Sequence, residues 1–251
     1  MVGICLLVAL GWTSASHQDP PRVAGKDTGT TVQTHSSAGR PTEIATFNKK
    51  AHSLSDPASI WVIVNKKRPL NPKDYAPSDL VTPNMPLRLA AGTTEMLLRR
   101  EAATALENMA AAGKRDGINL MVASAYRPYG FQATLYNRYV NQQGQAMADT
   151  QSARPGYSEH QTGLAVDLEP ASRTCEVEVC FATTAEGKWL DTHAHLYGFV
   201  IRYAKDQDAT TGYTYEPWHL RYVGTDLSNQ LHKTGTKTLE DFFSLEKAAD
   251  Y

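Results

Sequence analysis

Two short segments of the 251-residue chain combine residue types that bind metals. Residues 158–167 read SEHQTGLAVD, and residues 216–219 read EPWH. They supply His160, Asp167 and His219, and two histidines with one carboxylate form a catalytic zinc set that leaves a fourth position open. Asp167 lies in an apolar run, where an ionised aspartate is seldom found unless it is paired or bound to metal. These segments therefore predict a metal site with room for a reactant.

Glu216 precedes His219 by three residues, across a proline. We expect this spacing to place the carboxylate beside the metal without making it a ligand. A free carboxylate there can accept a proton from the attacking water and return it to the leaving group. A single histidine in an apolar run is more often a core residue, so the prediction of a hydrolytic site depends on both segments together.

The combined pattern is Ser-x-His-x-x-Gly-x-Ala-x-Asp, followed some fifty residues later by Glu-x-x-His. It resembles the zinc D-alanyl-D-alanine peptidases of the VanY type, whose fold is related to the hedgehog signalling domain. Further segments share the resemblance, which spans about residues 58 to 245: 61–75, 124–132, 154–168, 197–203 and 216–224. The resemblance implies a zinc-dependent D,D-carboxypeptidase that removes the C-terminal D-alanine of peptidoglycan stem peptides.

The resemblance also implies a role for each residue that matches the family pattern. One zinc ion per chain is expected on His160, Asp167 and His219, with Glu216 as the general base. Arg127 matches the arginine that the family places near the scissile carbonyl, where a permanent guanidinium donates hydrogen bonds to the developing oxyanion.

Two further positions, Ser158 and Gln132, match family positions associated with substrate binding. A hydroxyl and an amide suit a peptide or a terminal carboxylate. Two aromatic residues near the second motif, Tyr213 and Trp218, are expected either to line the pocket or to belong to the core.

Two alternatives remain open from the sequence. The same fold and metal set serve L,D-carboxypeptidases, which remove the D-alanine of a tetrapeptide stem. The domain could also be a non-catalytic cell-wall module that keeps zinc for structure. Glu216 and Arg127 favour an enzyme, because a structural zinc site needs neither and closes its fourth position with a protein ligand.

The hydrophobic pattern predicts the elements that must position these residues. Strands are expected at residues 59–65, 120–126, 164–168, 199–203 and 218–223. Helices are expected at 94–112, 131–144, 189–197 and 239–245. This order predicts an α+β fold with a central, mainly antiparallel sheet and flanking helices, which agrees with the hedgehog-like fold that the resemblance implies.

Composition limits the partners and the compartment. Acidic and basic residues number 26 and 25, which argues against a nucleic-acid partner, and no stable protein partner is expected. Residues 1–16 resemble a secretory signal, 17–45 a disordered tether, and 46–251 the catalytic domain, so we expect a secreted or cell-envelope enzyme. In such a compartment, Cys175 and Cys180 are expected to form a local disulfide.

Overall fold

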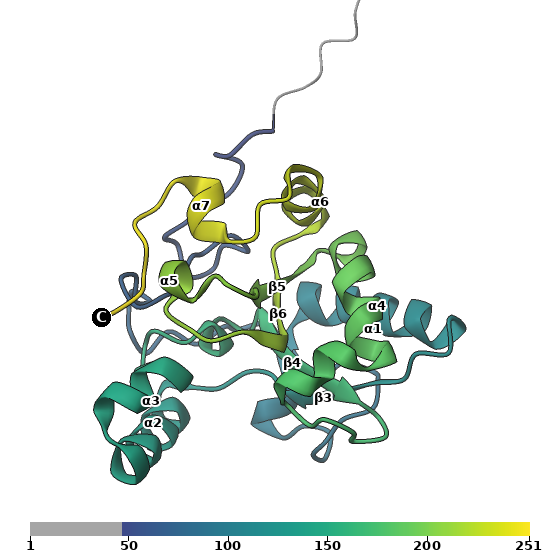
Figure 1. Ribbon diagram of the computed structural model, residues 1–251, viewed down its shortest axis with the longest axis horizontal. Coiled ribbons are helices and arrows are strands. Elements are labelled where there is room, and N and C mark those ends of the chain that lie inside the picture. Colours follow the sequence, from purple (N-terminus) through teal and green to yellow (C-terminus); the bar gives the residue numbers. More distant parts are fainter. Residues whose placement is uncertain (1–46) are drawn as a thin grey trace, which may run out of the picture. The chain divides into compact units, whose positions relative to one another are not determined.

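The computed structural model describes residues 47–251 (Figure 1). The predicted signal segment at 1–16 and the predicted tether at 17–45 lie outside these residues. A four-stranded sheet occupies the centre, and its strands follow the order β3 (Leu120–Ser124), β4 (Ala165–Pro170), β6 (Glu216–Tyr222) and β5 (Phe199–Tyr203). Every neighbouring pair in this sheet is antiparallel. The predicted α+β class with an antiparallel sheet is therefore confirmed.

The other elements surround this sheet, and a small second sheet pairs β1 (Leu80–Val81) with β2 (Leu98–Arg99). The helices are α1 (Arg100–Arg115), α2 (Tyr129–Gln143), α3 (Gln145–Gln151), α4 (Ala185–His193), α5 (Asp208–Thr211), α6 (Thr225–Thr234) and α7 (Leu239–Phe243). Short 3₁₀ turns are η1 (Thr94–Met96), η2 (Glu159–Thr162), η3 (Val179–Thr183) and η4 (Ala194–Tyr197). In Figure 1, α2 and α3 form a pair of helices on one side of the sheet, and α1 and α4 lie on the other.

Two hydrophobic clusters hold these layers together. The larger one joins the sheet to α1 and α4 through side chains such as Leu106, Val166 and Leu190. The smaller one packs Trp61 and Ile63 against α6 and α7. Within residues 47–251, no helix combines the length and the apolar character that a membrane span requires.

The segment at 59–65 was predicted as a strand, but it is not one, although its residues 61–65 are buried. Its backbone forms an isolated bridge between Asn65 and Arg68 and a hydrogen bond from Ile63 to the carbonyl of Leu54, and it pairs with no strand of the described sheets. Its carbonyl groups pair with a side chain instead, since the Arg221 guanidinium donates to the carbonyls of Ile60 and Val62. The hydrophobic pattern of a segment does not reveal whether its carbonyl groups bond to a neighbouring strand or to a distant side chain.

Two helix predictions also needed correction. The expected helix at 94–112 begins only at Arg100, because residues 98–99 pair with β1, and it continues past Gly113 to Arg115. The helix α6 was not among the predicted helices, and it covers the smaller cluster with Leu227 and Leu231. The predicted disulfide between Cys175 and Cys180 is present.

Candidate active site

The sheet register brings the two predicted motifs together. Asp167 on β4 lies directly opposite His219 on β6, and Ser124 on β3 pairs with Asp167 from the other side. Residues opposite one another on adjacent strands point to the same face, so these three side chains converge. Antiparallel pairing thus brings together residues that are separated by about fifty positions in the sequence.

His160 reaches the same point from η2, before β4 begins. The chain reverses at Gly163, which adopts a left-handed conformation with φ of 67°. A Cβ atom there would come within 3.0 Å of side-chain atoms of both Arg99 and Leu80. The left-handed conformation and the close side chains both favour glycine at this turn.

Each imidazole of the site is held through one nitrogen and presents the other. His160 Nδ1 donates to the carbonyl of Ala125 at 2.6 Å, which leaves Nε2 facing Asp167 Oδ2 at 3.4 Å. His219 Nε2 lies 3.5 Å from Glu159 Oε2, and its Nδ1 lies 3.2 Å from Asp167 Oδ1. The free nitrogens and the carboxylate thus face one another, which is how second-sphere hydrogen bonds orient histidine ligands.

The three side chains fit a metal ion. The ligand atoms of His160, Asp167 and His219 all lie within 4.8 Å of one another, and all three residues are buried. Asp167 Oδ1 is buried and accepts no hydrogen bond. A buried carboxylate oxygen without a partner is costly unless a cation or another donor meets it. The donor set of two imidazoles and one carboxylate suits zinc.

Electrostatics at the cluster favour a positive charge. Burial alone would raise the pKa of Asp167, but His160 and His219 beside it hold that pKa well below its usual value. Burial and the Arg127 charge lower the pKa of His160 to about 4, so its lone pair is available at neutral pH. Burial opposes a charge on His219, yet the neighbouring carboxylates of Asp167 and Glu159 raise its pKa to about 9. The cluster stabilises a cation, and a metal ion can take the place of that proton.

Glu216 lies at the start of β6, beside the cluster but outside it. Its Oε2 atom is 3.7 Å from His219 Nδ1. Burial raises its pKa to about 7, although the neighbouring His219 opposes that rise. A carboxyl group with a pKa near neutrality can both accept and return a proton, which is what a general base in hydrolysis must do.

A narrow hollow lies over the cluster, and most of the predicted site residues line it. Arg127 and Ser158 line it together with Glu216 and two tyrosines, Tyr203 and Tyr213. The Nε atom of Arg127 is buried and has no hydrogen-bond partner. Of the two aromatic residues considered from the sequence, Tyr213 is a lining residue and Trp218 packs against the larger hydrophobic cluster.

Gln132 is placed differently from the other predicted residues. Its side chain is completely buried, and its amide donates to Ser152 Oγ at 3.1 Å and to the carbonyl of Ala153 at 2.7 Å. It does not line the hollow. The geometry gives Gln132 the role of holding α2 to residues 152–153, and its contact with substrate stays a prediction.

Sequence reasoning missed several residues that support the cluster. Ser124 Oγ donates to Asp167 Oδ2 at 2.5 Å. Tyr203 packs on the His219 ring, with ring centroids 4.8 Å apart. Glu159, which accepts from His219, lies between two motif residues. Ser124 and Tyr203 lie at the ends of two segments that share the resemblance, 124–132 and 197–203, and this position was the one signal that could have identified them.

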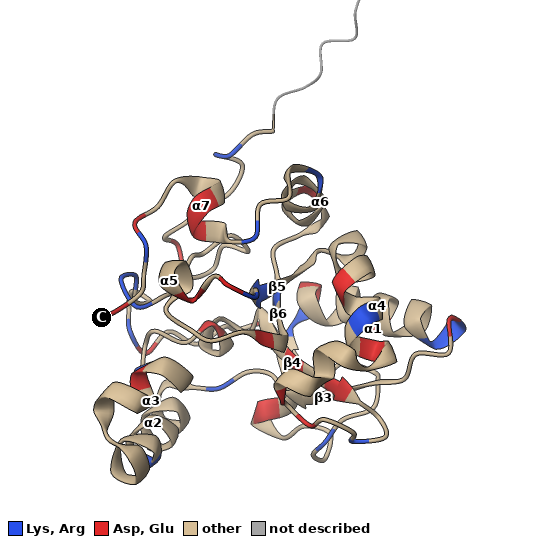
Figure 2. Ribbon diagram, viewed as in Figure 1, with Lys and Arg blue, Asp and Glu red and all other residues tan. Residues whose placement is uncertain are grey.

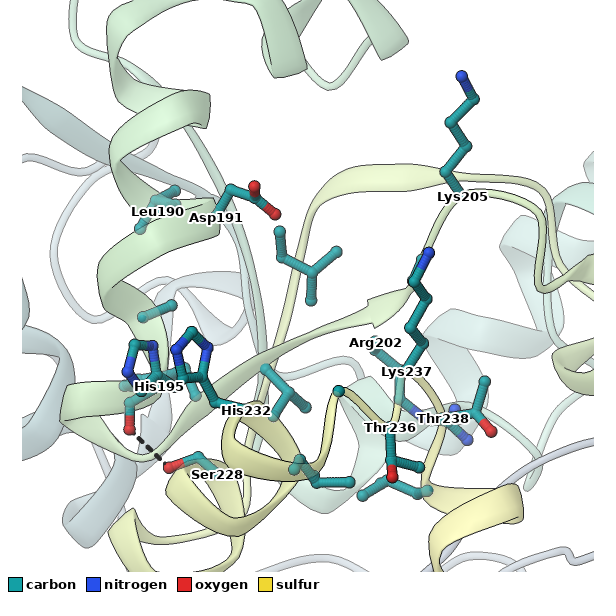
Figure 3. Close-up of a pocket in the computed structure, with 18 of the residues that line it drawn as sticks. Leu190, Asp191, His195, Arg202, Lys205, Ser228, His232, Thr236, Lys237 and Thr238 are labelled. Carbon is teal, nitrogen blue, oxygen red and sulfur yellow. Dashed lines mark hydrogen bonds between the residues drawn. The ribbon is translucent and has the colours of Figure 1, made fainter.

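A second, larger hollow of about 350 Å³ lies between α4, β5 and α6. His195 and His232 stack at one end of it, with ring centroids 3.6 Å apart, and Asp191, Lys205 and Lys237 lie around it (Figure 3). None of the three cluster residues lines it. The chemistry therefore belongs to the smaller hollow.

An antiparallel sheet that presents an imidazole, a carboxylate and a separate glutamate, with a second imidazole from the adjacent turn η2, is typical of a metallopeptidase. Comparison with known sequences agrees, because the family model described as VanY, D-alanyl-D-alanine carboxypeptidase, matches residues 95–225. YodJ of Bacillus subtilis (strain 168), which carries the name of a carboxypeptidase, is 40% identical over 195 residues, covering 78% of this chain and 71% of that protein.

Solved structures show the same relationship. The LD-carboxypeptidase LdcB superposes with a TM-score of 0.72 at 41% identity, covering 76% of this chain and 88% of that chain. A point mutant of the vancomycin-resistance D,D-pentapeptidase VanY, in complex with Zn(II), superposes with a TM-score of 0.59 at 28% identity, covering 72% and 97%. The chain belongs to the VanY carboxypeptidase family. It is a zinc peptidase.

Proposed function

We propose that this enzyme removes the C-terminal D-alanine from the tetrapeptide stem of peptidoglycan, as an L,D-carboxypeptidase. One observation carries the choice of substrate. The structure of LdcB, an LD-carboxypeptidase, matches with higher identity and a higher TM-score than that of the D,D-pentapeptidase VanY. The two activities differ in the chirality of the residue before the scissile bond, so the fold and the metal set are common to both.

The second candidate is the D,D-carboxypeptidase activity predicted from the sequence, with the pentapeptide stem as substrate. The description of the family model favours it, since that description names D-alanyl-D-alanine. Both candidates release a single D-alanine and use the same residues in the same roles.

We assign the roles as follows. Zinc on His160, Asp167 and His219 would polarise the scissile carbonyl and lower the pKa of a water to about 7. The Glu216 carboxylate takes the proton of the attacking water and delivers it to the departing amine. Arg127 donates hydrogen bonds to the carbonyl oxygen as negative charge develops there. Ser158 offers a hydroxyl to the peptide at the edge of the same hollow.

We further propose that the enzyme acts outside the cytoplasm. The disulfide between Cys175 and Cys180 supports this location, because disulfides persist in oxidising compartments. The nature of the substrate supports it as well, since stem peptides belong to the cell wall.

Mass spectrometry of reaction products tests the proposed substrate. The zinc-loaded full-length protein is incubated with stem tetrapeptide and with stem pentapeptide, each with and without a chelator. We expect the tetrapeptide to lose one alanine, and the chelator to abolish that loss. Loss from the pentapeptide alone would establish the D,D-carboxypeptidase instead, and cleavage that persists in chelator would refute the metal-dependent mechanism.

A further inference from the structure

A chain of buried ion pairs connects the cluster to the outer helix α7. Glu159 on η2, Arg202 on β5, Arg221 on β6 and Glu240 on α7 are each at most 1% exposed. Figure 2 shows charged residues on these central strands as well as on the outer helices. Four full charges are thus buried together, two of each sign, and each must find its partner within the protein.

Each contact in this chain is well defined. Glu240 accepts from Arg202 through both carboxylate oxygens, at 2.9 Å from Nη1 and 2.6 Å from Nη2. Arg202 uses its remaining Nε to donate to Glu159 Oε1 at 2.8 Å. Arg221 Nη1 donates to the same oxygen at 3.0 Å. One oxygen of Glu159 is therefore occupied by two guanidinium groups, and only Oε2 remains for His219.

The orientation of Glu159 decides which nitrogen His219 presents to Asp167. With Glu159 Oε2 beside Nε2, the proton of the neutral imidazole belongs on Nε2, and Nδ1 keeps its lone pair. If Glu159 turned away, His219 could take the other tautomer, in which Nδ1 carries the proton and cannot bind a metal.

The two arginines differ in how firmly they are anchored. Arg221 also donates to the backbone carbonyls of Ile60, Val62 and Tyr222, so it stays in place without Glu159. Among residues 47–251, the side chain of Arg202 donates hydrogen bonds to Glu159 and Glu240 alone. The position of the Arg202 guanidinium, and with it the contact that Arg202 makes to Glu159, therefore depends on Glu240.

We propose that Glu159 is a positioning residue for the metal ligand His219, and that Glu240 acts on the same ligand from α7 by holding Arg202. This inference rests on the metal site of the proposed function. It goes beyond that function because it makes α7, which contributes nothing to the hollow, part of the support of the site.

Zinc affinity of three variants tests this inference. Glu159→Gln removes the positioning charge and keeps the volume, and we expect zinc to bind about 10- to 100-fold more weakly. Glu240→Gln keeps the Glu159 side chain and removes only the charge that holds Arg202. We expect a smaller but measurable loss of zinc affinity. Glu169→Gln is the matched control, because Glu169 is also fully buried and paired with an arginine, Arg88, but does not contact His219. We expect it to bind zinc as the wild type does.

The tautomer of His219 provides a readout that a loss of stability alone would not change. Long-range ¹H–¹⁵N correlation spectra of the zinc-loaded wild type should show His219 protonated at Nε2 and bound through Nδ1. Equal zinc affinity in the wild type, Glu159→Gln and Glu240→Gln, or a His219 bound through Nε2, would overturn the inference. If Glu159→Gln does not fold, the comparison of zinc affinity between Glu240→Gln and Glu169→Gln tests the inference. A wild type that binds no zinc would instead refute the metal site of the proposed function.

Discussion

Glu216 illustrates how burial shifts the pKa of a carboxyl group toward neutrality. The carboxyl group lies beside His219 without ligand geometry, and burial raises its pKa toward neutrality. A cation bound beside it would favour the ionised form of the carboxyl group. With a pKa of about 7, a substantial fraction of the group is ionised, and able to accept a proton, near neutral pH.

Glu216→Ala is expected to lower kcat by about 10²- to 10⁴-fold, because general-base catalysis contributes that much. Zinc should still be bound, since Glu216 is not among the three clustered residues. Steady-state kinetics together with metal analysis check this, and His160→Ala serves as the comparison that loses zinc as well as activity. A Glu216→Ala enzyme with near wild-type kcat would show that another group is the base.

Arg127→Lys is expected to lower kcat by about 10²-fold or more with little change in KM, because the interaction strengthens only as the oxyanion forms. A lysine keeps the charge but lacks the planar pair of donors. The matched control is Arg138→Lys on the exposed side of α2, which should behave as the wild type. A rise in KM of about the same factor, with kcat unchanged, would instead show that Arg127 binds the substrate equally in the ground state and the transition state.

At the scale of elements, three antiparallel strands and one tight turn determine the geometry. The strands β3, β4 and β6 set Ser124, Asp167 and His219 side by side, and the turn at Gly163 adds His160 from outside the sheet. A shift of one residue in the β4–β6 register would turn one of the two ligands to the opposite face.

Gly163→Ala tests the turn. The left-handed backbone alone costs a non-glycine residue about 1–2 kcal/mol, and the new Cβ would in addition press on Arg99 and Leu80. Gly117→Ala has a similar φ of 79° and no atom within 4 Å of the new Cβ, so it isolates the backbone cost. We expect both to lower the free energy of unfolding and only Gly163→Ala to weaken zinc binding. Unchanged zinc affinity in Gly163→Ala would show that the turn tolerates displacement.

At the scale of the molecule, buried charges tie the outer helix α7 to the central strands. Arg202 holds the pKa of Glu240 below its ordinary value, although burial opposes this. Removing one partner of such a buried pair costs about 3–5 kcal/mol. The molecule is thus stabilised by contacts that acid weakens.

The difference in free energy of unfolding between the wild type and Glu240→Gln should therefore depend on pH. The pKa of Glu240 is lower in the folded protein than its ordinary value of 4.5, so its stabilising contribution is complete above that value and is lost as the pH falls toward the folded pKa. Urea unfolding of both proteins should give the same difference in free energy of unfolding at pH 7 and pH 5, and a smaller difference at pH 3.5. A gap that does not narrow at pH 3.5 would mean that the charge of Glu240 is not what stabilises α7.

Most of the candidate site could be predicted because its residues lie in two compact motifs. His160, Asp167, His219 and Glu216 converge as expected, and Arg127 and Ser158 line the hollow above them. The strand at 199–203 was predicted with its observed bounds, since its apolar run reflects a local pattern. The prediction of a strand at 59–65 was wrong, because Arg221, about 160 positions away, takes the place of a neighbouring strand at the carbonyls of Ile60 and Val62.

The sequence by itself determined the residue types of the metal set and the antiparallel class of the sheet, because both depend on short-range spacing and periodicity. Only the tertiary structure decided which nitrogen each histidine presents, where Gln132 points and what supports His219. Those properties depend on contacts between Glu159, Arg202 and Glu240, which come from different elements. Such contacts arise when the sheet and α7 pack together, and no local pattern in the chain records them.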